Sequence, residues 1–187
     1  MSRDQRANDN WALLHAQEIA LQNNLPLIVA FCLSPGFLGA TMRHYGFMLR
    51  GLQELERTLE MKNISFRLLS GTADEVLPEF VQDYDIAHVI CDFDSLKIKR
   101  IWKKNLASRL SVPLTEVDAH NIVPCRLASQ KVEFGAYTIR PKIHRLLPEF
   151  LEEFPALQTQ PTLWQHHQAT DWEQVWQSLT VDTSVGE

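Results

Sequence analysis

Residues 26–33, PLIVAFCL, decide the fold, because they form an uninterrupted apolar run of the length of one β-strand. A run that is apolar at every position is typical of a strand covered on both faces, as in a parallel sheet. Similar strand patterns follow at residues 64–71 (ISFRLLSG), 86–93 (IAHVICDF) and 112–120 (VPLTEVDAH). The sequence therefore predicts four strands, each of them spaced for a connection through a helix.

Helical patterns fill the spaces between these strands. Residues 43–62 carry an apolar stripe, residues 72–84 begin with a capping box formed by Thr72 and Glu75, and residues 95–110 form a third amphipathic pattern. A further helix precedes the first strand, capped by Asn8 or Asp9 and ending near Asn23. Alternating helices and strands predict an α/β fold with a doubly wound parallel sheet and helices on both faces.

Composition limits the classes of protein. The 187 residues have a net charge of −5, which argues against a general electrostatic binder of nucleic acid. No apolar run approaches the ~20 residues of a membrane span, and the N-terminus lacks a secretory pattern, so a cytoplasmic location is expected. Cys32, Cys91 and Cys125 form no CxxC pair, and the seven histidines have no ligand spacing. We therefore expect no zinc site and no disulfide, but reduced, buried thiols.

Open parallel sheets bind ligands beyond the carboxyl ends of their strands. The corresponding segments are CLSPGF, SGTADE, CDFDSL and VDAHN. Asp92 and Asp94 could bind a ligand or a cation there, or Asp94 or Ser95 could cap the next helix, and both interpretations stay open. In SGTADE a simple turn and cap is favoured over an anion site.

The basic segment KIKRIWKKNLASR contains an embedded tryptophan, which would also suit a nucleic-acid site. The favoured interpretation is an amphipathic helix whose inward side chains are Ile98, Ile101, Trp102 and Leu106. The solvated face would then carry the lysines, namely Lys97, Lys99, Lys103 and Lys104.

The pattern changes after the fourth strand. A short helix is predicted after Pro141, residues 155–170 resemble a linker, and DWEQVWQSL at residues 171–179 is a small amphipathic helix. Trp172, Val175, Trp176 and Leu179 share one side of that helix. An exposed stripe of this kind predicts docking on another domain or self-association.

Four segments carry a specific resemblance: MSRDQRANDNWALLHAQ, FCLSPGFLGATMRHYGFMLRGL, VDAHNIVPC and TIRPKIHRLLPEFL. They closely resemble the N-terminal α/β domain of class II cyclobutane pyrimidine dimer (deoxyribodipyrimidine) photolyases, in the photolyase/cryptochrome family. The resemblance runs from Met1 to about residue 155 and more loosely into DWEQVW. It implies a Rossmann-like antenna domain over residues 1–154 and an interdomain linker with a short helix over residues 155–187.

The resemblance also implies a larger helical domain that binds FAD, flips the damaged dimer out of UV-damaged DNA and splits it by light-driven electron transfer. That domain is absent from this sequence, so it would be a missing or separately encoded partner, and no catalytic residue is assigned. Trp164, Trp172 and Trp176 are not expected to be the electron-relay tryptophans. The chain alone is expected to be unable to repair DNA.

For an antenna pigment of the deazaflavin or folate type, the resemblance points to residues at the strand ends. Phe37 and Met48 would supply apolar walls. The candidate cofactor-binding residues are Arg3, Cys32, Leu33, Ser34, Phe37, Met48 and Asp94.

The N-terminus departs from the family pattern, because relatives carry a hydrophobic first strand just before MSRDQR. In the related fold that strand is central. We expect the four remaining strands to form one four-stranded sheet, with Arg3 loosely held. Two other functions stay open: a stand-alone module that binds a nucleotide or flavin-like ligand, and a non-functional remnant of a photolyase.

Overall fold

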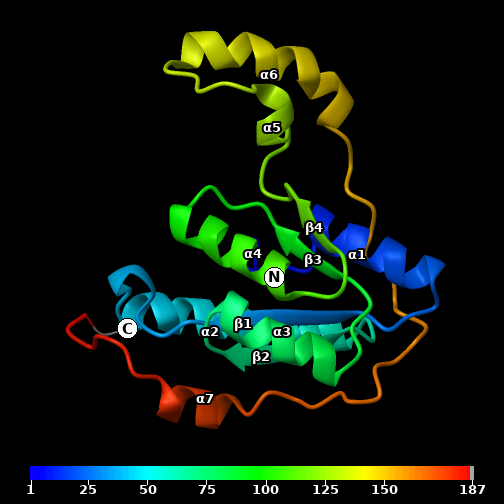
Figure 1. The fold of residues 1–187 in the computed structure, drawn as a ribbon, viewed down its shortest axis with the longest axis vertical. Coiled ribbons are helices and arrows are strands. Elements are labelled where there is room, and N and C mark those ends of the chain that lie inside the picture. Colours follow the sequence, from blue (N-terminus) through cyan, green and yellow to red (C-terminus); the bar gives the residue numbers. More distant parts are fainter. Residues whose placement is uncertain (186–187) are drawn as a thin grey trace.

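Strands and helices alternate along the chain in the computed structural model, which describes residues 1–185 (Figure 1). This alternation confirms the predicted α/β fold. The elements are α1 (Trp11–Gln22), β1 (Ile28–Leu33), the short 3₁₀ helix η1 (Phe37–Gly39), α2 (Met42–Glu60), β2 (Ser65–Ser70), α3 (Ala73–Asp83), β3 (Val89–Asp92), α4 (Lys97–Arg109), β4 (Leu114–Val117), α5 (Cys125–Ala128), α6 (Ala136–Phe150) and α7 (Trp172–Ser178).

The strands do not form one sheet. Within residues 1–185 they form two separate parallel pairs, β1 with β2 and β3 with β4. The prediction of one four-stranded sheet is therefore wrong. The amino-terminal residue lies beside β1, where the Met1 amino group donates a hydrogen bond of 2.8 Å to the carbonyl of Ala30. One carbonyl on the inner edge of β1 is thus paired with Met1 and not with β3.

Two helical layers cover the strands. Helices α1 and α2 contribute to the main core with the buried side of β1, whereas α3 and α4 contact each other on the opposite face (Figure 1). The main core contains side chains with no exposed surface, namely Leu49, Leu52, Leu59 and Phe66. The first half of the domain therefore holds most of the deeply buried apolar side chains.

Helix ends follow local side-chain chemistry. The capping box of Thr72 and Glu75 is present as predicted. Helix α1 is capped by Asn10, whose side chain accepts from the Leu13 N–H at 3.1 Å, and not by Asn8 or Asp9. Asn10 is 1% exposed, and its amide nitrogen also donates to the carbonyl of Asp4. This second hydrogen bond connects the cap to the preceding loop.

Helix α6 begins before Pro141 and not after it as predicted. The carbonyl of Gly135 accepts both the N–H and the hydroxyl of Thr138, and this contact starts the helix one turn earlier. Pro141 and Pro148 then lie inside the helix, where each removes one backbone donor.

The faces of α4 differ in part from the prediction. Leu106 is buried and Ile98 and Trp102 are half-buried, but Ile101 is 47% exposed, so its predicted inward position is wrong. Two lysines predicted to be solvated, Lys99 and Lys103, are half-buried because they contact aromatic rings, and Lys103 also pairs with Glu116. The other two predicted lysines of this helix are exposed.

The C-terminal segment is fixed on the domain. Gln160 has no exposed surface, and it donates from its N–H to the carbonyl of Lys62 at 2.7 Å and from its side chain to the carbonyl of Leu25 at 2.8 Å. The side chains of α7 pack against the main core, where Trp172 stacks on Phe66 at 6.2 Å. The predicted exposed stripe is therefore wrong, since its side chains are half-buried against the main core of the same domain.

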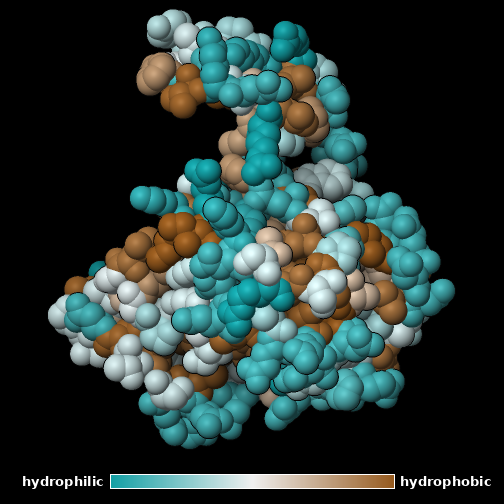
Figure 2. Space-filling view, viewed as in Figure 1, coloured by the Kyte–Doolittle hydropathy of each residue, from teal (hydrophilic) through white to brown (hydrophobic). Residues whose placement is uncertain are grey.

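Helices α5 and α6 form an arm that projects from the rest of the domain (Figure 1). Cys125 begins α5 and is exposed, which contradicts its predicted burial, whereas Cys32 and Cys91 are half-buried. Figure 2 shows hydrophobic side chains on the arm. Among the described helices, none is both long and apolar enough to cross a membrane.

Candidate functional site

A pocket of about 450 Å³ lies beyond the carboxyl ends of β1 and β3, between the 34–40 loop, the start of α2 and the start of α4. We call it the crevice pocket. The structure brings every candidate residue predicted from the sequence into its lining: Arg3, Cys32, Leu33, Ser34, Phe37, Met48 and Asp94. Their common position at the strand ends follows from the parallel topology.

A buried tyrosine shapes the apolar wall of the crevice pocket. The hydroxyl of Tyr45 donates to the carbonyl of Ser34 at 2.5 Å and accepts the N–H of Phe37 at 2.9 Å. Gly36 between them has a φ of +67°, which glycine adopts without strain. Tyr45 is 3% exposed, so the loop that presents Phe37 is fixed to α2.

Lys99 supplies a cation that the sequence reasoning missed. Its ammonium lies 4.7 Å from the ring centre of Phe37 and 4.9 Å from that of Trp102, and it reaches the Ser2 hydroxyl at 3.3 Å. Burial lowers the pKa of Lys99. The spacing of three residues between Lys99 and Trp102 places both side chains on one face of a helix, and this spacing could have indicated their contact.

Asp92 fixes the N-terminal segment over the end of β3. Its buried carboxylate accepts the backbone N–H groups of Ser2 at 2.8 Å, Arg3 at 2.9 Å and Asp4 at 3.3 Å. Asp92 thus holds the backbone of the N-terminal segment, a role that the sequence did not predict. The backbone of Arg3 is held firmly by this contact, while its side chain is exposed at the pocket.

Asp94 does not cap α4, because the N-cap residue of that helix is Leu96 and, within residues 1–185, no side chain makes a capping hydrogen bond there. Its carboxylate accepts the N–H of Leu96 at 2.9 Å, in the turn that leads into α4. Asp94 is 7% exposed and also lines the crevice pocket.

Two further groups set the electrostatics of this end of the domain. Burial raises the pKa of the Cys32 thiol, which keeps this side chain neutral as part of the wall. Burial also raises the pKa of Asp4, partly opposed by Arg6, whose Nε lies 3.1 Å from the carboxylate.

The crevice pocket combines apolar walls with cations at its edge. Phe37 and Met48 offer flat and flexible apolar contacts, and Arg3 and Lys99 can contact an anionic substituent. No group of three or more His, Cys, Asp or Glu side chains within residues 1–185 is placed to hold a metal ion. The arrangement suits the binding of a planar organic ligand.

Comparison with known proteins identifies the family. The family model for DNA photolyase matches residues 1–160. A deoxyribodipyrimidine photo-lyase from Potorous tridactylus is 51% identical over 190 residues, covering 100% of this chain and 36% of that protein. Its counterpart from Arabidopsis thaliana is 45% identical over 166 residues, covering 88% of this chain and 34% of that protein. The chain thus spans about a third of the length of these curated relatives.

The fold is similar to that of a solved structure. A cryptochrome from Synechocystis sp. PCC6803 superposes with a TM-score of 0.68 at 14% identity, covering 89% of this chain and 36% of the cryptochrome chain. This likeness supports the fold, and the sequence matches support the family. The chain belongs to the DNA photolyase family, and it corresponds to the N-terminal α/β domain of that family.

Proposed function

We propose that this chain is the light-harvesting N-terminal domain of a class II DNA photolyase that repairs UV-induced cyclobutane pyrimidine dimers. The assignment to class II rests on the four sequence segments described above. The observation that carries the antenna role is the crevice pocket, where all seven candidate residues lie together at the strand ends.

The dimensions and lining of the pocket fit a pigment of the deazaflavin or folate type. A volume of about 450 Å³ lies in the usual range of small-molecule sites. The ring of Phe37 and the side chain of Met48 would contact the flat face of the pigment, while Arg3 and Lys99 would contact its anionic part. When bound, such a pigment would absorb light and pass the excitation energy to a flavin outside this chain.

The partner in this proposal is a helical domain that holds FAD and contacts UV-damaged DNA. The arm of α5 and α6 offers it a surface, since several large hydrophobic side chains on and beside this arm are more than half exposed: Ile122, Leu127, Val132, Phe134 and Tyr137. Phe134 is 95% exposed. Cover by a second domain would remove this apolar surface from water.

Titration of the purified chain with deazaflavin and folate pigments, followed by absorbance and fluorescence, tests pigment binding. Phe37→Ala should weaken binding by about tenfold or more, because a large aromatic contact is lost. Phe47→Ala is the matched control, since Phe47 is 83% exposed and lies outside the pocket lining. Absence of binding, or equal weakening by both variants, would contradict the antenna role.

A light-driven repair assay with added FAD tests whether repair requires the helical domain. The chain alone should show no turnover of dimer-containing DNA, because the residues that hold FAD and the lesion would lie in the helical domain. Turnover by this chain alone would overturn the proposal.

One observation favours a second candidate function, a stand-alone module that binds a nucleotide or flavin-like ligand. The crevice pocket places two cations, Arg3 and Lys99, beside apolar walls, and this lining suits the phosphate and ring of a nucleotide as well as a pigment. Copurification of a nucleotide with the chain, together with failure of both pigments to compete with it, would support this function over the antenna role.

A further inference from the structure

Charge is distributed unevenly between the arm of α5 and α6 and the rest of the chain. Residues 119–148, which contain α5 and most of α6, carry five Lys or Arg side chains and one acidic side chain, Glu133, which gives a net charge of +4. Since the whole chain has a net charge of −5, all other residues together carry −9. The arm is therefore a basic segment of an acidic chain, and it projects from the domain (Figure 1).

The arginines of α6 lie on one exposed face of the helix. Between residues 137 and 148, exposed side chains recur at spacings of three, one, three, one and three residues, which is the repeat of a single helix face. The residues between them, such as Ile139, Ile143 and Leu146, are half-buried. Glu149 follows this face, which therefore ends in the last turn of the helix. We call the exposed face the basic stripe, and it consists of Tyr137, Arg140, Pro141, His144, Arg145 and Pro148.

The arginines of the basic stripe are not paired within the domain. Neither Arg140 nor Arg145 makes an ion pair or a side-chain hydrogen bond with any of residues 1–185. The nearest acidic residue before the stripe, Glu133, is held instead by Lys142 and by the hydroxyl of Ser129, which donates to it at 2.7 Å. The hydrogen bond from Lys142 lowers the pKa of Glu133 to about 2, so this carboxylate stays ionised and its charge is balanced by Lys142. The charges of the two arginines are thus available to a partner.

The composition of the basic stripe favours phosphate groups over a protein surface as its partner. Arginine donates two parallel hydrogen bonds to a phosphate, and a tyrosine hydroxyl donates a further one. The stripe contains no Leu, Ile, Val or Met, whereas the centre of a protein interface is apolar. Its single aromatic ring is that of Tyr137, whereas single-stranded nucleic acid is bound by several aromatic rings in succession. These features fit the regular phosphate backbone of a duplex.

We propose that the basic stripe of α6 binds the phosphate backbone of duplex DNA, independently of base sequence and of damage. Arg140 and Arg145 are separated by about 7.5 Å along the helix axis, which is close to the rise of about 6.8 Å over two nucleotides of one strand. Each arginine therefore contacts one phosphate when α6 lies along the strand. This site goes beyond the proposed function, in which the helical domain contacts DNA, and it requires neither a pigment nor FAD.

Titration of the full chain with a short undamaged DNA duplex tests the proposal. Nuclear magnetic resonance locates the contact, and the amide resonances of residues 137–148 should shift most. Fluorescence anisotropy of a labelled duplex gives the association constant at several salt concentrations. A plot of its logarithm against the logarithm of the salt concentration should have a slope of about −2, because each of the two phosphate contacts contributes about −0.9.

Arg140→Gln and Arg145→Gln should each reduce the steepness of this slope by about 1 and weaken binding by about fivefold at low salt. Both side chains are exposed and unpaired, so the midpoint of thermal unfolding should not change. Arg140→Lys should keep the salt dependence, because it keeps the charge. Arg57→Gln, at an exposed arginine of α2, is the matched control. Arg100→Gln, at an exposed arginine of α4, separates the stripe from the other basic helix, and both of these variants should bind like the unchanged chain.

Absence of binding would overturn the proposal, as would equal weakening by Arg100→Gln and the two stripe variants. Tighter binding of a single strand of the same sequence would overturn the assignment to a duplex. Polyglutamate is the remaining probe, since binding of this acidic polypeptide as tightly as the duplex would show a surface for an acidic protein and would overturn the phosphate partner. The stripe lies outside the crevice pocket, so the same variants should leave the pigment titration unchanged, and the two proposals fail separately.

Discussion

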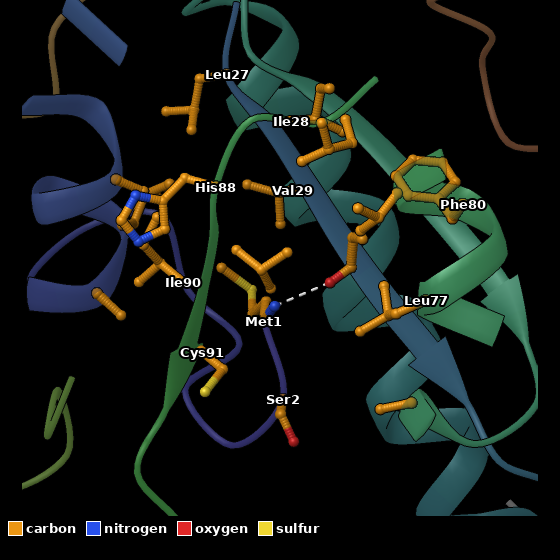
Figure 3. Close-up of a pocket in the computed structure, with 18 of the residues that line it drawn as sticks. Met1, Ser2, Leu27, Ile28, Val29, Leu77, Phe80, His88, Ile90 and Cys91 are labelled. Atoms are coloured by element: carbon orange, nitrogen blue, oxygen red, sulfur yellow. Dashed lines mark hydrogen bonds between the residues drawn. The ribbon is translucent and has the colours of Figure 1, made fainter. Parts of the chain in front are cut away.

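The two sheets contain the same strand–helix–strand unit, yet they are buried to very different degrees. In the β1–β2 half, Val29, Phe31, Leu33 and Phe66 are all less than 8% exposed. In the β3–β4 half, the apolar residues of both strands are half-buried, and Asp92 is the buried strand residue. The first half is covered by α2 and the C-terminal segment, whereas the cavity of about 300 Å³ between β1 and β3 is lined by both halves (Figure 3). Burial of a strand thus depends on neighbours that its own sequence does not encode.

Truncation of one apolar side chain in each half should show the difference in packing between the two halves most clearly. Leu52→Ala should lower the free energy of unfolding by about 2–5 kcal/mol, because Leu52 has no exposed surface and its truncation leaves a cavity in the core. Ile90→Ala in β3 should cost only about 1 kcal/mol, because Ile90 is half-buried and lines the cavity between β1 and β3. Chemical denaturation of both variants measures the difference. Equal losses would show that the two halves are packed alike.

Removal of the Asp92 carboxylate should loosen the contact between the carboxyl end of β3 and the N-terminal segment. Asp92→Ala leaves three backbone N–H groups without their acceptor and should cost about 1–3 kcal/mol. Hydrogen exchange at residues 2–4 should accelerate at the same time. Asp83→Ala, at an exposed carboxylate in α3, is the control and should change neither quantity. Unchanged exchange at residues 2–4 would show that other contacts hold this segment.

Glu56 anchors the C-terminal segment on the first half, and loss of this anchor should leave the first half less buried. The buried carboxylate of Glu56 accepts the N–H and hydroxyl of Thr170, at 2.9 Å and 2.7 Å, and the indole N–H of Trp172. Glu56→Gln should cost about 1 kcal/mol and shift tryptophan emission to longer wavelength as α7 loosens. Glu54→Gln, one exposed position on the same helix, is the control. Identical spectra for both variants would mean that apolar packing alone holds α7.

Local patterns predicted the elements well because they depend on neighbouring residues. The Thr72–Glu75 box and the apolar runs that became β1 and β3 involve contacts within a few positions of the chain. The positions of Phe37, Met48 and Asp94 in one pocket followed from the rule that parallel strands share their carboxyl edge, together with the family resemblance.

Long-range contacts could not be predicted from such patterns. The role of Asp92 depends on an N-terminal segment about 90 residues earlier, and the burial of Lys99 depends on Phe37 in another loop. The stripe on α7 was correctly recognised as apolar, but its partner is the core beside Glu56, more than 100 residues away. The separation into two sheets likewise depends on contacts between distant segments, since Met1 and a cavity lie between β1 and β3.

The route of the C-terminal segment has a consequence for synthesis on the ribosome. Leu157 belongs to the main core, and the carbonyl of Asp182 accepts the N–H of Met42 at 2.7 Å, so the first half is completed by residues translated well after its own strands. At about 5–20 residues per second, the roughly 120 residues between Lys62 and Asp182 take on the order of 10 s to emerge. During that interval the apolar faces of α2 and β2 lack the cover that residues 157–182 supply, so the best-packed half of this domain stays incomplete after its own strands have been translated.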